Sequence, residues 1–157
     1  MSEYSRDALL DCSEFREGVE HFDTKRFWHA HESWETIWLA SSGDQKTFLQ
    51  GLIQLTAAYH LLGRGRFPGA LRLFRSSASK LSASSSYGSA IIDLSAILAY
   101  TTRAIPIVES AVGAAISVQF PEAPVLASLL AQTEISNRKS SGDAKLEILE
   151  RVSSDSD

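Results

Sequence analysis

The residue types that could perform chemistry gather in two short stretches of the sequence. The first stretch holds a histidine and two glutamates, namely His31, Glu32 and Glu35. The second stretch, further along the chain, holds Gln54 and His60. Two imidazoles and one carboxylate, with room left for a water, form a ligand set typical of catalytic zinc sites. The sequence therefore makes His31, Glu35 and His60 candidate ligands of a divalent metal such as zinc.

Helical periodicity decides whether these side chains can meet. On a helix over residues 25–40, His31 and Glu35 fall on one face among the tryptophan side chains. The next helix, expected over 45–63, is apolar nearly all round, so we expect it to be the central, buried helix. If the two helices pack antiparallel, His60 converges on His31 and Glu35. A buried carboxylate is costly unless it is paired, so Glu35 needs a partner.

Two interpretations of this His/Glu cluster stay open. In the first, Glu35 pairs with His31, and His60 or Gln54 completes a hydrogen-bonded network that fixes the register of the two helices. In the second, the cluster is a metal centre, and Glu32 or Glu35 is the catalytic group that activates a bound water. The chain has no HExxH motif, so the spacing alone does not decide between them.

The first half of the chain is expected to form two helical hairpins. A first helix has one apolar face around Phe15 and Phe22, and a fourth helix is expected over 68–82, after a glycine-rich break. An Arg-Phe pair followed by an alanine and an aromatic residue occurs twice, at an offset of 40 residues. This echo indicates either two hairpins built on one plan or only the generic spacing of helix packing.

The second half of the chain is expected to be helical but less regular. A serine-rich loop over 82–89 precedes apolar helices over 90–104 and 107–118, which Pro106 separates. The sequence thus predicts an all-α bundle of six or seven helices, in a single domain over 1–131. A polar, Ser-rich tail over 132–157 follows it.

Composition excludes several classes of protein. The 157 residues are 44% hydrophobic, which rules out a disordered chain. No apolar run approaches the about 18 residues that span a bilayer. The N-terminal sequence lacks the pattern of a signal peptide, and the lone Cys12 excludes an internal disulfide, so we expect a cytoplasmic protein. A net charge of −4 argues against general nucleic-acid binding, although residues 51–104 are basic.

The two stretches also carry a resemblance. They read Phe27-x-x-Ala30-His31-Glu32-x-Trp34-Glu35-x-x-Trp38 and Gln50-Gly51-Leu52-Ile53-Gln54-Leu55-x-Ala57-Ala58-Tyr59-His60. Over residues 15–82 the chain is similar to domain-of-unknown-function family 309. The resemblance implies a compact all-helical fold and the general label of predicted metal-dependent hydrolase. The site positions that it implies are His31, Glu32, Trp34, Glu35, Trp38, Gln54 and His60. Family members tend to have Asn-x-Gly before the second helix, where this chain has Asp23-Thr24-Lys25.

Three functional hypotheses follow from these observations. The first is a helical bundle that binds a small ligand or a partner beside the His/Glu cluster, without catalysis. The alternatives are a divalent-metal-dependent hydrolase that uses the cluster and a protein-interaction module that resembles short tetratricopeptide arrays. A homodimer is one of the partner arrangements kept open. The expected binding residues are Trp34, Trp38, Gln54, Tyr59, Arg64 and Arg66.

Overall fold

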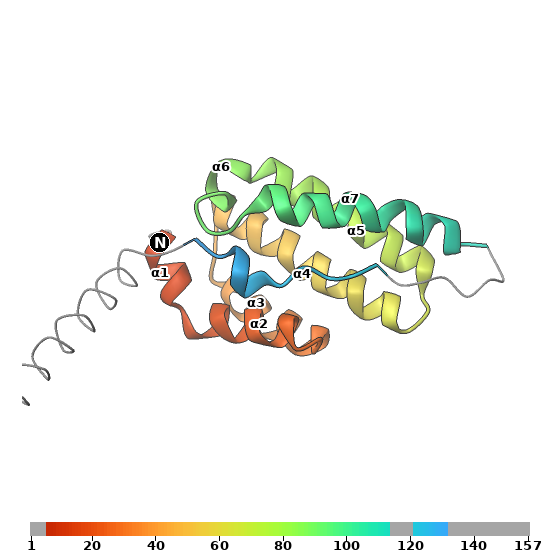
Figure 1. Cartoon of the computed structure of the whole chain (residues 1–157). Helices are drawn as coiled ribbons and strands as arrows, with labels where there is room; N and C mark the ends of the chain where they lie inside the picture. The colour runs from red at the N-terminus through yellow and green to blue at the C-terminus, as the bar shows by residue number, and fades with distance from the viewer. Residues whose placement is uncertain (1–5, 114–120, 132–157) are drawn as a thin grey trace, which may run out of the picture.

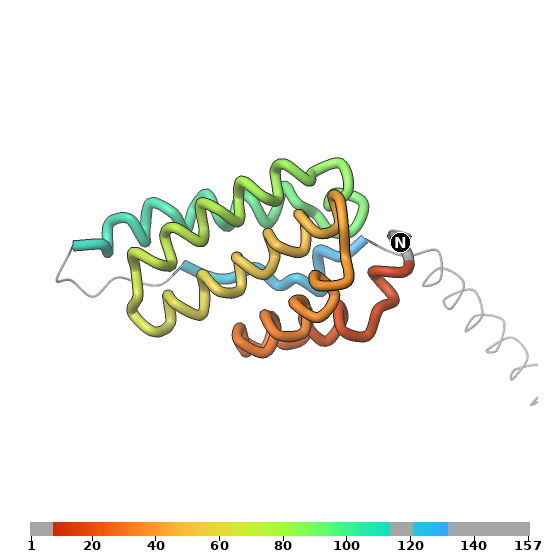
Figure 2. Tube along the Cα trace, turned by 180° about the vertical axis from the view of Figure 1, so that it is seen from behind, coloured from red at the N-terminus to blue at the C-terminus, as the bar shows by residue number. Residues whose placement is uncertain are grey.

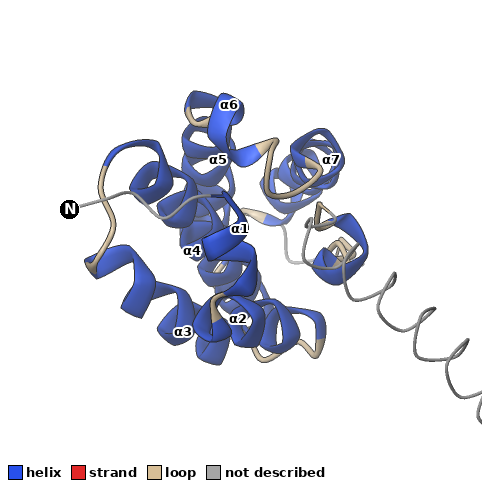
Figure 3. Ribbon diagram, turned by 90° about the vertical axis from the view of Figure 1, so that its left-hand side faces the viewer, coloured by secondary structure: helices blue, strands red, loops and turns tan. Residues whose placement is uncertain are grey.

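The computed structural model describes residues 6–113 and 121–131. Within these ranges the chain forms seven α-helices and one short 3₁₀-helix and contains no strand (Figure 3), which confirms the predicted all-α class. Residues 132–157, expected to form a tail, lie outside the described ranges. The helices are α1 (Arg6–Asp11), α2 (Ser13–Asp23), α3 (Phe27–Leu39), α4 (Gly43–Gly63), α5 (Phe67–Ala83), α6 (Ser85–Gly88), α7 (Leu94–Ala111) and the 3₁₀-helix η1 (Leu126–Leu129).

The long helices pack on one another largely in chain order. Helix α2 contacts α3, α3 contacts α4, α4 contacts α5, and α5 contacts α7 (Figure 1). Helix α4 lies between α3 and α5 and is buried along most of its length, with Phe48, Leu52 and Leu55 fully enclosed. The prediction that this apolar helix is central is confirmed. No helix in the described ranges is both long and apolar enough to cross a membrane.

The hairpins α2–α3 and α4–α5 follow one plan. In the second helix of each hairpin, an alanine and the aromatic residue four positions later are fully buried, namely Ala30 with Trp34 and Ala70 with Phe74. Gly18 of α2 lies directly against the Trp34 indole, so the two helices approach closely there. The offset of 40 residues seen in the sequence is therefore a structural repeat.

Both hairpin turns use the same hydrogen bonds. The backbone N–H groups of Arg26 and Arg66 each reach back five residues to a helical carbonyl, at 2.7 Å and 2.9 Å. The residue at the centre of each turn is left-handed, with φ of 63° at Lys25 and 72° at Gly65. This is the Schellman arrangement, which most often has glycine at that position. The glycine-rich break after α4 is thus a turn, as the sequence predicts, and the side chain of Arg66 is exposed.

The segment 121–131 returns past α4 to α2 and closes the row of helices into a bundle (Figures 1 and 2). The Asp23 carboxylate, at the end of α2, accepts hydrogen bonds from the backbone N–H groups of Leu126 at 2.7 Å and Ala127 at 3.0 Å. The N–H of Asp93 donates to the carbonyl of Leu129 at 2.8 Å. One carboxylate therefore holds the first turn of η1 against α2.

The predicted break at Pro106 is wrong, because α7 continues through it from Leu94 to Ala111. A proline inside a helix leaves the carbonyl four residues earlier without its N–H donor, and that residue is Thr102. Both Thr102 and Pro106 are exposed, so water can bond the carbonyl. The serine-rich loop likewise contains the short helix α6, and the part of the second predicted helix over 114–118 lies outside the described ranges.

Candidate functional site

Most of the predicted site residues that stay accessible lie on one surface made by α3 and α4, which we call the α3–α4 face. Its residues recur every three or four positions along each helix, so each set forms a stripe. Contacts at both ends join the two stripes, between Trp28 and His60 and between Trp38 and Lys46. The face consists of Trp28, His31, Glu32, Glu35, Trp38 and Leu39 from α3, with Lys46, Gln50, Ile53, Ala57, His60 and Arg64 from the length and C-terminal end of α4.

At one end of the face, the Trp28 indole contacts two imidazoles. Its ring stacks on that of His31, with centroids 5.0 Å apart and planes inclined by 3°. The His60 ring lies 5.5 Å from the same indole, tilted by 42°. The indole Nε1 donates to Oε1 of Glu32 at 3.1 Å, yet the Trp28 residue is 50% exposed. The Trp28 side chain is therefore held in place by these contacts and still presents a large apolar surface to solvent.

The predicted burial of Glu35 is wrong. Its Oε2 lies 3.6 Å from Nδ1 of His31, and the two side chains are 47% and 22% exposed, respectively. The buried residues of α3 are Ala30, Trp34 and Ile37, about a quarter turn around the helix from His31. Because α3 turns that side toward the core, the carboxylate of Glu35 reaches water and needs no buried partner.

His31, Glu35 and His60 do not form the predicted metal-ligand set. In the ranges 6–113 and 121–131, no three His, Cys, Asp or Glu side chains are arranged so that they could hold a metal ion. The Trp28 indole contacts both imidazoles, and the Glu35 carboxylate faces solvent. Glu32, expected as a catalytic base, instead accepts the indole hydrogen bond of Trp28.

Two polar atoms of the α3–α4 face are hidden from water without a hydrogen-bond partner among the described residues. They are Nδ1 of His31 and Nε1 of Trp38. The ammonium of Lys46 lies 4.5 Å from the centre of the Trp38 ring, a cation–π contact that leaves the indole N–H unused. Buried polar groups in proteins are nearly always paired, so these two atoms are exceptions on the face, although Nδ1 of His31 lies 3.6 Å from Oε2 of Glu35.

His60 favours its neutral form. Burial is the largest cause that lowers the pKa of its imidazole, and the positive charges of Arg64 and His31 lower it further. A neutral imidazole carries one donor and one acceptor nitrogen. This end of the face therefore offers hydrogen bonds rather than a fixed positive charge from His60.

Other expected binding residues lie elsewhere. Trp34 is fully buried and its Nε1 donates to the carbonyl of Phe15 at 3.1 Å, so it belongs to the core and cannot contact a ligand. Oε1 of Gln54 accepts from the Ser76 hydroxyl of α5 at 2.9 Å, which turns Gln54 away from the His/Glu cluster that it was expected to complete. Tyr59 is buried on a different side of α4, where it lines a cavity.

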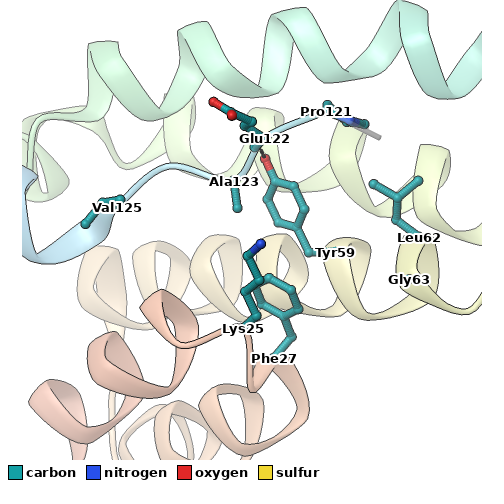
Figure 4. Close-up of a pocket in the computed structure, with 9 residues that line it drawn as sticks. All are labelled: Lys25, Phe27, Tyr59, Leu62, Gly63, Pro121, Glu122, Ala123 and Val125. Carbon is teal, nitrogen blue, oxygen red and sulfur yellow. Dashed lines mark hydrogen bonds between the residues drawn. The ribbon is translucent and has the colours of Figure 1, made fainter. Parts of the chain in front are cut away.

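This cavity, of about 480 Å³, was not foreseen from the sequence (Figure 4). It lies between the turn before α3, the end of α4 and the segment 121–125, and Tyr59 is the one predicted site residue on its wall. Sequence periodicity could not show it, because an extended segment supplies one wall. The lining residues are Lys25, Phe27, Tyr59, Leu62, Gly63, Pro121, Glu122, Ala123 and Val125.

The fold and the site thus define an all-helical bundle built on two repeated hairpins, with a mixed aromatic and polar face on α3 and α4. Residues 15–73 match the family model of a Domain of unknown function (DUF309), which confirms the resemblance carried by the two motifs. The matched residues run from α2 into α5. Comparison with curated proteins and with solved structures finds no match.

Proposed function

We propose that the protein binds an extended segment of a partner protein along the α3–α4 face. The observation that carries the proposal is the Trp28 indole, which is 50% exposed on this face although its ring contacts those of His31 and His60. On the same face, the indole N–H of Trp38 is a donor with no acceptor among the described residues. A peptide carbonyl would pair with this donor once a shift of the Trp38 ring uncovers it.

The spacing of His31 and Trp38 along α3 suits a polypeptide. His31 and Trp38 are seven residues apart on α3, which places them about 10 Å apart along the helix axis. An extended chain covers that distance in about three residues. One short peptide segment can therefore contact both side chains, whereas a very small molecule reaches only one of them.

Exposed apolar side chains supply further binding surface. Trp28 is 50% exposed and Leu39 is 69% exposed, and their spacing of eleven residues puts them on the same side of α3. Tryptophan is among the residues that contribute most to protein–protein binding when a partner covers them. Glu32 and Glu35 accompany them on α3 and Lys46 on α4, so both charge signs are present for selectivity.

Selection of peptides by display against the wild-type chain tests this proposal. Trp28→Ala is expected to weaken the selected peptides at least about tenfold, because it removes the largest exposed apolar contact. The matched control is His29→Ala, which changes the next residue, an exposed imidazole that contacts His21 instead. Both variants should keep the melting temperature of the wild type.

Two results would overturn the proposal. One is a selection that yields no peptide with a Kd in the micromolar range. The other is a set of peptides that bind Trp28→Ala and His29→Ala equally well.

A further inference from the structure

We infer that the cavity between Lys25, Tyr59 and the segment 121–125 is a second binding site, which takes a small apolar carboxylate. None of its lining residues belongs to the α3–α4 face, so this inference does not depend on the proposed partner binding. Its volume of about 480 Å³ lies in the range of small-molecule sites.

The walls of the cavity are mainly apolar. Phe27 and Tyr59 stack with ring centroids 5.5 Å apart and planes inclined by 24°, and together they form a rigid aromatic wall. Leu62 adds an aliphatic side chain from α4, and Val125 of the returning segment lines the opposite end of the cavity (Figure 4). Val125 is 58% exposed. A ligand with an apolar body would cover it.

Lys25 supplies the charge. Among the described residues, its ammonium has no ion-pair partner within 4.0 Å. Figure 4 shows the Lys25 ammonium beneath Ala123 and near the Tyr59 ring, whereas the Glu122 carboxylate lies on the α7 side of the returning segment. The acid of the lining set therefore does not neutralise the lysine.

Tyr59 forms part of the cavity wall and carries no charge. Its hydroxyl donates to the carbonyl of Glu122 at 3.3 Å, which fixes the returning segment over the cavity. Burial raises the pKa of the phenol, so it stays protonated. The carbonyls of Leu61 and Leu62 at the end of α4 already accept backbone hydrogen bonds in the turn. The Lys25 ammonium is thus the one full positive charge among the lining residues.

The backbone of Lys25 gives independent support. Its φ of 63° matches the 72° of Gly65 in the repeated turn, where glycine occupies this position without strain. A side chain in the left-handed region is energetically unfavourable, and such residues cluster at functional sites. The chain therefore has a lysine in a strained backbone conformation at a position that lines this cavity.

A single ammonium beside an aromatic and aliphatic wall fits a monocarboxylate with an apolar body. A phosphate carries more charge and accepts more hydrogen bonds, so it needs several donors, which this wall lacks. A neutral apolar molecule would fill the walls and leave the lysine unpaired.

Binding of octanoate and of 1-octanol to the full chain tests this inference, with isothermal titration and amide chemical shifts as readouts. We expect octanoate to bind about tenfold more tightly than 1-octanol, since only the acid pairs with the ammonium. Lys25→Gly should reduce octanoate binding to the level of 1-octanol and leave 1-octanol unchanged. Lys25→Arg should retain the preference, and Lys80→Ala, a lysine of α5 outside the lining set, should not alter it.

A loss of octanoate binding in Lys25→Gly cannot be due to unfolding, because this substitution relieves backbone strain and should raise the melting temperature. Failure of octanoate to bind at millimolar concentration would overturn the inference. Equal binding of octanoate and 1-octanol to the wild type, or unchanged octanoate binding by Lys25→Gly, would overturn it too. Loss of peptide binding at the α3–α4 face would leave these results unaffected.

Discussion

Lys25 and Gly65 occupy the same left-handed position in two turns that share one hydrogen-bond pattern, with φ of 63° and 72°. The first turn joins α2 to α3 and the second joins α4 to α5. The two residues therefore differ in side chain but not in backbone conformation. Substitutions at Lys25 and Gly65 can therefore measure the energetic cost of the left-handed conformation apart from the role of the lysine side chain.

The substitutions Lys25→Gly and Gly65→Lys are expected to change the free energy of unfolding in opposite directions. Lys25→Gly should raise the free energy of unfolding by about 1 kcal/mol, because glycine adopts the left-handed region without steric conflict. Gly65→Lys should lower it by about 1 kcal/mol. A Cβ at Gly65 has no neighbour within 4 Å, so that loss reports the backbone alone. Urea denaturation measures both; a destabilised Lys25→Gly would contradict the account.

Gly18 is expected to tolerate no side chain. A Cβ there would overlap Nε1 of the Trp34 indole, whose hydrogen bond to Phe15 it would displace. We expect Gly18→Ala to lower the free energy of unfolding by about 3 kcal/mol, the order seen for overpacked cores. Gly63→Ala is the control, because a Cβ there meets nothing within 4 Å and alanine favours the helix. Equal stability of the two variants would show that α2 and α3 do not approach as described.

Asp23 is expected to hold the returning segment in place. Asp23→Ala removes the acceptor of the Leu126 and Ala127 N–H groups and should lower the free energy of unfolding by about 2 kcal/mol. Asp23→Asn keeps one acceptor oxygen and should lose about half as much. Denaturation curves of the two variants measure these losses. A loss below about 0.5 kcal/mol for Asp23→Ala is typical of an ordinary surface residue and would contradict the prediction.

Stability is expected to depend on pH through His60. Burial, and then the charges of Arg64 and His31, lower the pKa of His60 in the folded protein. As the pH falls through about 6.5, the unfolded chain therefore takes up the proton first, and the free energy of unfolding decreases until the folded pKa is passed. His60→Gln should flatten this part of the profile of melting temperature against pH. An unchanged slope between pH 7.5 and about 5 would place His60 in water.

The helical hairpins could be predicted from the sequence because the same spacing of arginine, aromatic residue and alanine recurs. Periodicity gave the extents of α3, α4 and α5 to within about two residues, and the apolar character of α4 gave its central place. The interior proline misled, because a helix can continue through a proline where water bonds the freed carbonyl. At Pro106 the surface is exposed.

The orientation of α3 could not be predicted in the same way. Three tryptophans and two polar residues leave the centre of its apolar stripe ambiguous, and the close contact of Gly18 with Trp34 selects one rotation. That rotation puts Trp34 in the core, and leaves Trp28 and Glu35 in contact with solvent. The Lys25 cavity was missed for a different reason, since its far wall comes from residues about a hundred positions away along the chain.

The indole N–H resonances of the three tryptophans test partner binding on the α3–α4 face most directly. On addition of a selected peptide, the account predicts a downfield shift of Trp38 Nε1–H, which gains an acceptor, and a smaller change at Trp28. Trp34 Nε1–H already bonds to Phe15 in the core and should not move. A bound peptide that leaves Trp38 and Trp28 unshifted, or that shifts Trp34 equally, would contradict the account.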